Sequence, residues 1–591
     1  MSISANFPAV KPSILLDFAN SQQLDPRVTF SRSTTAPYYD GKTSALAEQN
    51  LLLNSNVFNT TWVLSNLGTG GTAPTIATTT GTLPDGSTGT IYQLTFPTLT
   101  AGQASAIYQS ITSAHGLTAW TGSVYAQIAS GTATVYTVLE DSLAAPSGGN
   151  YVTATQALTT SWQRLTVSGS YTSGSGNAVL VIGFDGRISG QTNPSSLTVN
   201  LAFAQLEQRS SVTAYNATTT SALTNYIPQL LTAPINAPRF DFNPTTGESL
   251  GLLIEQSSTN LLLQSQFASV WTNTNTTSTQ SANIAPDGTQ TAIKLVENSG
   301  LAYHNIQQTV SASNPIVSVY AKAGERSQIA FFVGGASIGV GFNLLTGATT
   351  SISGYTAGSS TTSITAVGNG WYRCSMTFTG SVTFVQIGIG SGGAGNYTGD
   401  GYSGIYIWGA QLEALAFPTS YIPTTSAQVT RASDNASMTG TNFSSWYNIA
   451  QGTLYGEASS PLVSAGYALL AGIYDSNTVT NNVIDLYTRG GTTNSRINIA
   501  LSGNNYTAYP AFFPPNSFTK LGFSFSSTTG IGVQAGGSAV TITYPYLPST
   551  VNTLFIGQRY SGGLAINGWI KKLAYYPIAV TSAQLQALTG S

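Results

Sequence analysis

The sequence predicts an all-β protein built from three β-sandwich domains, the first two of which share one fold. Three observations lead to this prediction: strands that alternate polar and apolar residues, a series of motifs that occurs twice, and a composition poor in charge but rich in aromatic and β-branched residues. Alternation with period two is clear in residues 315–323 and 404–413, and Gly, Asn, Ser and Asp form the turns between such runs. A helical period is readable only at the C-terminus, where Thr581 or Ser582 is expected to cap a short helix.

The repeated motifs occur in the same order, about 200 positions apart. Asn50 to Trp62 reads NLLLNSNVFNTTW, and Asn260 to Trp271 reads NLLLQSQFASVW. The motifs that follow in the two copies are PDGSTGTIYQL and PDGTQTAIKL, SVYAQI and SVYAKA, SWQRLTV and GWYRCSM, and AQLEQ and AQLEA. Each copy spans about 160 residues with many short strands, which is the size of a two-sheet jelly roll. We therefore expect two tandem homologous jelly-roll β-sandwiches.

The sequence changes character after the second copy, where runs such as GTLYGEAS, ALLAGIYD and KLGFSFS predict a third sandwich. The segment between the copies is punctuated by Pro and is expected to be an ordered connector, and the first 45 residues resemble that connector. The predicted division is an N-terminal arm (1–45), jelly-roll 1 (46–223), the connector (224–258), jelly-roll 2 (259–440) and a third sandwich (441–591).

The composition argues against several classes of protein. Only 7% of the 591 residues are charged, against roughly 25% in ordinary globular proteins. Because 10% are aromatic, the chain is nevertheless expected to fold. A net charge of −2 without a basic patch argues against nucleic acid as a partner, and a single cysteine, Cys374, excludes a disulfide framework. We see no export signal and expect no membrane span.

Residues that could perform catalysis or bind metal are sparse. The two histidines, His115 and His304, are far apart in the sequence and are expected at turns or on the surface. Asp185 and Asp400 lie in matching Gly-rich loops and are weak calcium candidates, although a turn-forming role is favoured for both. No pair of carboxylates can be assigned to one surface for glycoside cleavage, so no catalytic residue and no cofactor are predicted.

Aromatic side chains are more informative. Strand parity directs Tyr372, Cys374, Met376 and Phe378 toward the core of the second copy. The opposite face of each copy then carries aromatic and polar side chains, as proteins that stack on sugar rings do. The glycan-binding candidates on these faces are Trp162, Arg164, Tyr125, Trp371, Arg373 and Tyr320. The alternative is that these rings pack under a loop or a neighbouring chain.

Several of these segments also resemble a known family. NLLLQSQFASVW, SVYAKAG, NGWYRCSMTF and the long run that ends YIPTTSAQVTRASD are similar to strand signatures of tailed-bacteriophage fibre and decoration proteins built from carbohydrate-binding-module-like jelly rolls. The resemblance covers roughly residues 45 to 435. The C-terminal stretch, with GTLYGEAS and TLFIGQRYSGGLAINGWIKKLAYYPI, resembles laminin-G/concanavalin-like domains.

This resemblance implies a virion structural protein, homotrimeric, attached to other virion proteins through its N-terminal region and binding host-surface polysaccharide without cleaving it. Modules of this type often carry calcium-binding Asp residues in their last strand. At that position this chain has YIWGAQLE and NLAFAQLE, which contain no Asp and argue against a retained calcium site. The predicted function is therefore that of a head or tail fibre that adheres to host glycans. A decoration protein that serves assembly and a polysaccharide depolymerase are the alternatives.

Overall fold

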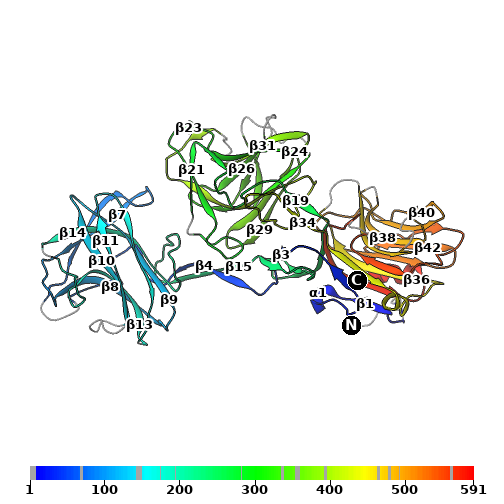
Figure 1. Cartoon of the computed structure of the whole chain (residues 1–591), viewed down its shortest axis with the longest axis horizontal. Helices are drawn as coiled ribbons and strands as arrows, with labels where there is room; N and C mark the ends of the chain where they lie inside the picture. The colour runs from blue at the N-terminus through cyan, green and yellow to red at the C-terminus, as the bar shows by residue number, and fades with distance from the viewer. Residues whose placement is uncertain are drawn as a thin grey trace.

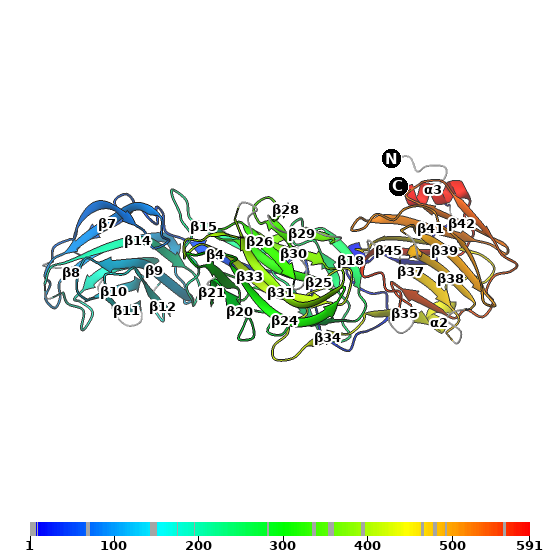
Figure 2. The same cartoon turned by 90° about the horizontal axis from the view of Figure 1, so that it is seen from above.

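The computed structural model describes residues 8, 10–66, 71–141, 150–173, 175–193, 195–280, 283–333, 339–352, 360–391, 396–461, 466–476, 481–490, 493–559 and 563–590. Within these ranges the chain is almost entirely β and forms three β-sandwiches, as predicted. The three sandwiches follow one another along an elongated molecule (Figure 1, Figure 2). Jelly-roll 1 lies at one end, and the sandwich that includes the first and last described strands lies at the other.

The sandwich that includes the first and last described strands, here called the basal sandwich, has two large sheets. The first sheet has eight strands: β17 (Phe240–Phe242), β18 (Ser249–Ile254), β45 (Gly568–Tyr576), β36 (Gly452–Ser459), β41 (Thr519–Phe525), β42 (Thr529–Gln534) and β43 (Val540–Thr543) in this order, with β1 (Ile14–Leu16) also paired to β45. The second sheet has seven, in the order β2 (Thr29–Ser31), β35 (Asn435–Thr439), β44 (Thr553–Ile556), β37 (Tyr467–Tyr474), β38 (Val483–Gly490), β39 (Arg496–Leu501) and β40 (Asn504–Ala508).

These pairings correct the linear division of the chain. The N-terminal arm (1–45) and the connector (224–258) are not separate segments, because β1, β2, β17 and β18 are strands of the basal sandwich. Leu15 pairs with Ala574, and Leu253 pairs with Trp569, across several hundred residues of sequence. The physical reason is burial: the arm and the connector contribute Ile14, Leu16, Leu252 and Ile254 to the same hydrophobic core as the C-terminal strands.

Both jelly rolls are therefore insertions between strands of the basal sandwich, and each is carried on a short two-stranded ladder. Jelly-roll 1 begins after β4 (Ser44–Asn50) and ends before β15 (Leu223–Pro228), and these two strands pair with each other. Jelly-roll 2 is bounded in the same way by β19 (Ser258–Asn260) and β34 (Val429–Arg431). A further ladder of β3 (Ala36–Tyr38) and β16 (Leu231–Ala233) joins the two crossing segments.

Jelly-roll 1 consists of two five-stranded sheets that enclose one core. One sheet contains β11 (Tyr151–Leu158), β10 (Ala133–Glu140), β13 (Asn177–Asp185), β8 (Ala104–Ala114) and β5 (Val63–Ser65). The other contains β12 (Gln163–Ser170), β9 (Ala119–Ile128), β14 (Leu197–Glu207), β7 (Thr88–Phe96) and β6 (Thr75–Thr82). The residues of one parity, such as Val124, Leu165 and Leu201, fill the core between the sheets.

Jelly-roll 2 repeats this arrangement with two six-stranded sheets. The first contains β20 (Thr272–Thr274), β24 (Asn305–Ser313), β31 (Ser381–Gly390), β26 (Gln328–Val333), β27 (Gly339–Asn343) and β28 (Ala348–Ser351). The second contains β21 (Thr276–Gln280), β22 (Ile293–Glu297), β33 (Gly404–Glu413), β25 (Ile316–Ala323), β30 (Trp371–Thr377) and β29 (Thr362–Gly368). As predicted from parity, the core contains Cys374, Met376 and Phe378, and Tyr372 packs against it.

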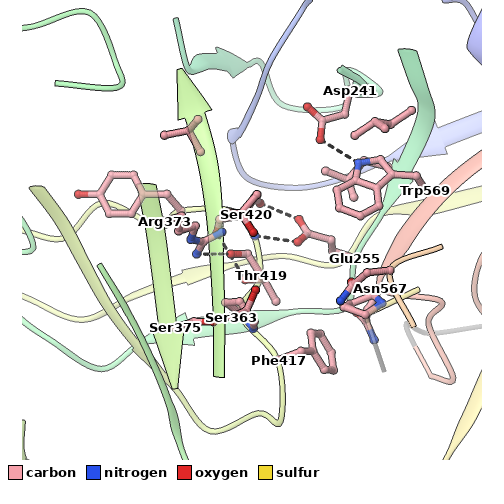
Figure 3. A pocket seen from close by; sticks show the side chains of 18 of the residues that line it. Asp241, Glu255, Ser363, Arg373, Ser375, Phe417, Thr419, Ser420, Asn567 and Trp569 are labelled. Carbon is pink, nitrogen blue, oxygen red and sulfur yellow. Dashed lines mark hydrogen bonds between the residues drawn. The ribbon is translucent and has the colours of Figure 1, made fainter. Parts of the chain in front are cut away.

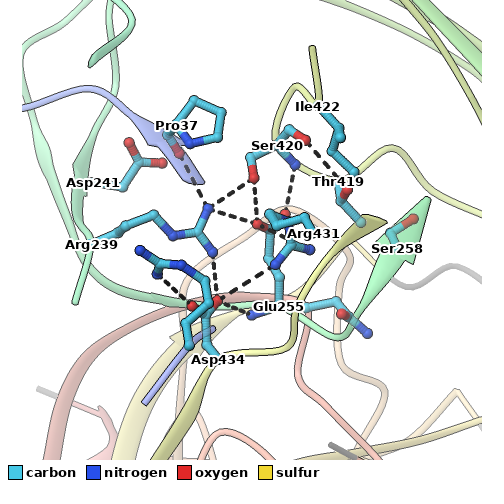
Figure 4. A network of polar contacts seen from close by, with 12 residues as sticks. Pro37, Arg239, Asp241, Glu255, Ser258, Thr419, Ser420, Ile422, Arg431 and Asp434 are labelled. Atoms are coloured by element: carbon cyan, nitrogen blue, oxygen red, sulfur yellow. Dashed lines mark hydrogen bonds and ion pairs between the residues drawn. The ribbon is translucent and has the colours of Figure 1, made fainter. Parts of the chain in front are cut away.

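A buried network of charges fixes the point where the arm, the connector and the end of jelly-roll 2 enter the basal sandwich. Asp434 accepts hydrogen bonds from Arg32 (2.8 Å) and Arg239 (2.5 Å). Glu255 forms ion pairs with Arg239 (2.8 Å) and Arg431 (3.5 Å). Figure 4 shows Arg239 and Arg431 converging on the two carboxylates. We call these five residues the clasp, because they come from four separate stretches of the chain.

The pairing of Glu255 within the clasp favours its ionised form. Burial alone would raise the pKa of Glu255, but the charges of Arg431 and Arg239 and the hydrogen bonds from Ser420 outweigh it and lower the pKa to about 2. Removing one partner of such a buried network leaves an uncompensated charge in the interior. The clasp therefore holds the three chain crossings in one arrangement.

The predicted C-terminal helix is α3 (Ser582–Gly590), and Thr581 caps it. The Thr581 hydroxyl accepts a hydrogen bond from the Gln584 N–H (3.3 Å), and the Gln584 side chain accepts one from the Thr581 N–H (3.0 Å), which is a reciprocal capping box. Two single-turn helices, α1 (Phe18–Ser21) and α2 (Thr441–Ser444), complete the helical content of the described residues. Among these residues, no helix is both long and apolar enough to cross a bilayer.

Candidate functional site

The outer face of one sheet in jelly-roll 1 presents both aromatic and polar side chains. Tyr125 in β9 lies directly opposite Arg164 in β12, and both side chains are half-buried. The Arg164 guanidinium lies 5.4 Å from the centre of the Tyr125 ring, and it donates hydrogen bonds to the Ser123 hydroxyl and the Thr213 carbonyl. These contacts hold the guanidinium over the Tyr125 ring.

Trp162 stands next to this pair, immediately before β12. Its ring is half-buried, and its Nε1 donates a hydrogen bond to the Thr82 carbonyl at 2.8 Å. Behind it, Phe203 and Tyr215 stack with ring centres 4.5 Å apart, and Phe203 meets Tyr125 edge-on. The aromatic part of the face is therefore a packed group of four rings, of which Tyr125, Trp162 and Tyr215 remain partly accessible.

A strip of carboxamides extends from these rings along the same face. The backbone register places Asn200 opposite both Gln93 and Gln127, on neighbouring strands. Gln93 donates a hydrogen bond to Asn200 at 3.2 Å, while the Gln127 side chain makes no hydrogen bond within the described part of the chain. All three are half-buried. An amide offers both donors and an acceptor, so this strip can bind a ligand rich in hydroxyl groups.

In jelly-roll 2 the equivalent face is closed, and the expectation of an open ring platform there is wrong. Trp371 is 0% exposed and Tyr320 is 3% exposed. Both belong to a cluster with Tyr39, Leu230 and Phe242, which come from the arm and the connector. The face is covered because the ladder segments that carry the jelly rolls need an apolar surface to pack on. The rings pack under chain segments, which is the alternative that the sequence left open.

Arg373 keeps the position that parity predicts and is half-buried, like Arg164. Its guanidinium lies 5.4 Å from the Tyr320 ring centre and donates to the Ser318 hydroxyl and the Thr419 carbonyl, which repeats the arrangement of Arg164 in jelly-roll 1. The carboxamide strip is not repeated. Its three positions are occupied by Lys294, Tyr406 and Lys322, and the two lysines form ion pairs with Glu325 and Glu48.

Some residues of the jelly-roll 1 face were not predicted from the sequence. Parity alone could have indicated Gln93 and Asn200, because they alternate with core residues of β7 and β14. Phe203 could not be found in this way. It has a φ of 55°, at a register shift in β14, and the corresponding position in jelly-roll 2 is Gly409, with a φ of 63°.

The weak calcium candidates both serve as hydrogen-bond acceptors in turns. Asp185 accepts bonds from the Arg187 backbone and guanidinium, and Asp400 accepts bonds from the backbone of Tyr402 and Ser403. Within the described ranges no group of three His, Cys, Asp or Glu side chains is arranged to hold a metal ion. Calcium binding remains a prediction without a test.

The two histidines lie in short loops between strands, which agrees with the turn position expected for them, but both are buried and not at the surface. His115 stacks on Tyr171 with ring centres 3.9 Å apart, and His304 bonds through both ring nitrogens to the carbonyls of Asn275 and Tyr397. Both therefore have packing roles.

No protein-family model matches the sequence, and no curated protein matches it. Among solved structures, the chain is similar to the CBM40 domain of the Ruminococcus gnavus IT-sialidase bound to α2,3-sialyllactose, at 13% identity and a TM-score of 0.23, over 25% of this chain and 88% of that one. It is also similar to the tandem CBM22-1–CBM22-2 domains of Paenibacillus barcinonensis Xyn10C, at 14% identity and a TM-score of 0.19, over 64% of this chain and 98% of that one. A third similar structure is that of domains LG4-5 of the mouse laminin α1 chain, at 12% identity and a TM-score of 0.19, over 47% of this chain and 86% of that one. These values assign the chain to no family.

Proposed function

We propose that this protein is a bacteriophage virion fibre or appendage protein that binds host-surface glycans without cleaving them, through the outer face of jelly-roll 1. The observation that carries the proposal is the carboxamide strip of Gln93, Asn200 and Gln127 beside the partly accessible rings of Tyr125 and Trp162. A sugar ring has apolar C–H faces and a hydroxyl rim, so it can stack on such rings and bond to such amides.

The arrangement of the chain supports an adhesive role. The strands nearest both chain ends lie in the basal sandwich, and jelly-roll 1 lies at the opposite end of the molecule (Figure 2). Attachment through the basal end would therefore place jelly-roll 1, which carries the carboxamide strip, at the far end of the molecule. A single shallow face binds sugar weakly, and a homotrimer would multiply three such contacts into useful avidity.

The experiment measures binding of the purified full-length protein to host cells and to isolated surface polysaccharide, with reducing-end release followed in the same samples. We expect saturable binding without release. Trp162→Ala and Gln127→Ala should each weaken binding at least about fivefold, since a ring contact or a hydrogen bond contributes about 1 kcal/mol. Tyr509→Ala, which removes an accessible ring from the basal sandwich, is the matched control and should bind normally.

Three results would contradict the proposal. Release of reducing ends would instead support a depolymerase. Absence of binding at every concentration would favour a decoration protein that serves assembly. Binding that survives both substitutions in jelly-roll 1 would locate the sugar site elsewhere in the chain.

A further inference from the structure

A cleft lies between jelly-roll 2 and the basal sandwich, and no motif in the sequence indicates it. Its volume is about 700 Å³, which is in the range of small-ligand sites. One wall is the outer face of β29 and β30, at the edge of the sheet that the arm and the connector leave uncovered. The other wall comes from β17, β18 and β45 of the basal sandwich, so only the folded chain brings the two walls together.

The jelly-roll wall is lined by hydroxyl groups. Ser363 in β29 lies directly opposite Ser375 in β30, and Thr365 lies opposite Arg373. Ser363 and Thr365 are exposed on this face, and Thr361 and Thr377 extend the row. The wall can therefore exchange hydrogen bonds with a polyhydroxyl ligand without presenting a fixed charge along most of its length.

The basal wall carries an oriented aromatic ring. Trp569 in β45 is half-buried, and its Nε1 donates a hydrogen bond to the Asp241 carboxylate at 2.8 Å, which fixes the plane of the indole. Figure 3 shows Trp569 and Asn567 on one side of the cleft, Arg373 and Ser363 on the other, and Phe417 at its edge. A ring held in this way provides a flat apolar surface for stacking.

The charges around the cleft are unbalanced. The two carboxylates that line it are already satisfied: Asp241 accepts bonds from Trp569 and the Tyr39 N–H, and Glu255 belongs to the clasp. Arg373 uses its Nη2 for the Ser318 and Thr419 bonds. Its Nη1 makes no hydrogen bond, and no carboxylate lies within ion-pairing distance, in the part of the chain that the structure describes. The cleft therefore contains one cation without a protein counter-ion.

We propose that the cleft is a second saccharide site and that it takes a sugar acid, whose carboxylate pairs with Arg373 while its ring stacks on Trp569. The row of Ser363 and Ser375 bonds to the sugar hydroxyls. A single unpaired guanidinium matches a singly charged carboxylate, whereas a phosphate carries a charge of about −1.5 to −2. The proposal extends the glycan-binding function but uses residues that jelly-roll 1 does not contribute, so the two sites can be tested separately.

The test titrates the full-length protein with acidic oligosaccharides and follows binding by calorimetry. The probes are trigalacturonate, a hyaluronan tetrasaccharide and an α2,8-linked trisialic acid, each with its carboxyl-reduced neutral counterpart. We expect at least one acidic probe to bind and its neutral counterpart to bind at least about tenfold more weakly, because a hydrogen bond to a charged group is lost.

Ser363→Trp is the blocking variant, and Thr279→Trp, which adds the same ring at an exposed position on β21, the opposite edge strand of the same sheet, is its matched control. Ser363 is exposed on β29, so the larger ring enters the cleft without disturbing either core. Ser363→Trp should lose binding of the acidic probe, while Thr279→Trp and the jelly-roll 1 variant Trp162→Ala should keep it.

The proposal fails if no acidic probe binds, if the neutral counterparts bind equally well, or if Ser363→Trp leaves binding intact. If acidic sugars bind only through jelly-roll 1, so that Trp162→Ala abolishes binding and Ser363→Trp does not, the cleft is excluded while the proposed function stands. Loss in Ser363→Trp alone supports the cleft.

Discussion

Arg32 and Asp434 form an ion pair across 402 residues of sequence, with 2.8 Å between Nη1 and Oδ1 and both side chains fully buried. The pair joins the N-terminal arm to the segment that leaves jelly-roll 2. Both jelly rolls are inserted between these two residues, so the pair marks the place where the chain re-enters the basal sandwich after forming the two jelly rolls.

Asp434→Ala should destabilise the basal sandwich strongly. The carboxylate accepts bonds from Arg32, Arg239 and the Glu255 N–H. Its removal takes away the carboxylate that pairs with the buried Arg32 and leaves Arg239 with Glu255 alone. We expect a loss of about 3–5 kcal/mol in the free energy of unfolding. Chemical denaturation, with hydrogen exchange of β2 and β35, measures it.

The matched control for the clasp is Glu325→Ala, which breaks the ion pair with Lys294. The Glu325 side chain is 36% exposed, so water replaces the lost partner and the cost should stay within about 1 kcal/mol. If Asp434→Ala and Glu325→Ala lower the free energy of unfolding equally, burial is not what makes the clasp stabilising.

A fragment of residues 441–591, the third domain of the linear division, should not fold cooperatively. It lacks β1, β2, β17, β18 and β35, and with them part of the hydrophobic core. A fragment of residues 44–228 should fold, because it contains both sheets of jelly-roll 1 and the ladder that closes them. Thermal melts followed by circular dichroism compare the two fragments. A sharp melt of the 441–591 fragment would contradict the interleaved architecture.

Glu140→Gln should stabilise the protein at neutral pH. Glu140 is buried in β10, and neither carboxylate oxygen has a hydrogen-bond partner; burial, followed by the negative charge of Asp185, raises its pKa to about 8. The folded state favours the protonated form of Glu140. The stabilisation that results is therefore fully present below pH 4.5 and is lost as the pH rises toward 8. The substitution should recover up to about 3 kcal/mol at pH 7.

The melting temperature of the full chain between pH 5 and pH 8 tests this prediction. The wild-type value should fall over this interval more steeply than that of the variant. Glu207→Gln is the control of opposite sign, since both oxygens of Glu207 accept hydrogen bonds from Thr213 and their loss should destabilise jelly-roll 1. Parallel pH profiles for the wild type and Glu140→Gln would contradict the assigned pKa.

Gly409→Ala should destabilise jelly-roll 2. Gly409 has a φ of 63°, and a Cβ atom there would lie 3.0 Å from the Tyr320 ring and 3.3 Å from that of Tyr421. Gly131→Ala is the control, because Gly131 also has a positive φ but no neighbouring atom within 4 Å. The control should lose about 1–2 kcal/mol from backbone strain, and Gly409→Ala should lose about 1–3 kcal/mol more from overpacking. Equal losses of stability in the two variants would show that the Tyr320 and Tyr421 rings move aside without cost, and would contradict the overpacking.

The candidate site was partly predictable. Strand parity correctly separated the two faces of each jelly roll and directed Trp162, Arg164 and Tyr125 away from the core. Parity could not tell which of the two faces would remain accessible, because Trp371 and Tyr320 follow the same local pattern and yet are covered. Covering depends on residues such as Tyr39 and Phe242, which are distant in the sequence.

The sequence by itself determined the all-β class, the two homologous jelly rolls, the faces of their strands and the C-terminal helix cap. These properties follow from local alternation and from motif order, which each segment carries without reference to the others. The tertiary structure decided that the arm and the connector complete the basal sandwich, that one jelly-roll face is closed, and that a cleft forms beside it. Each depends on pairing and burial between segments hundreds of residues apart, and no local pattern specifies which distant segment will supply the partner.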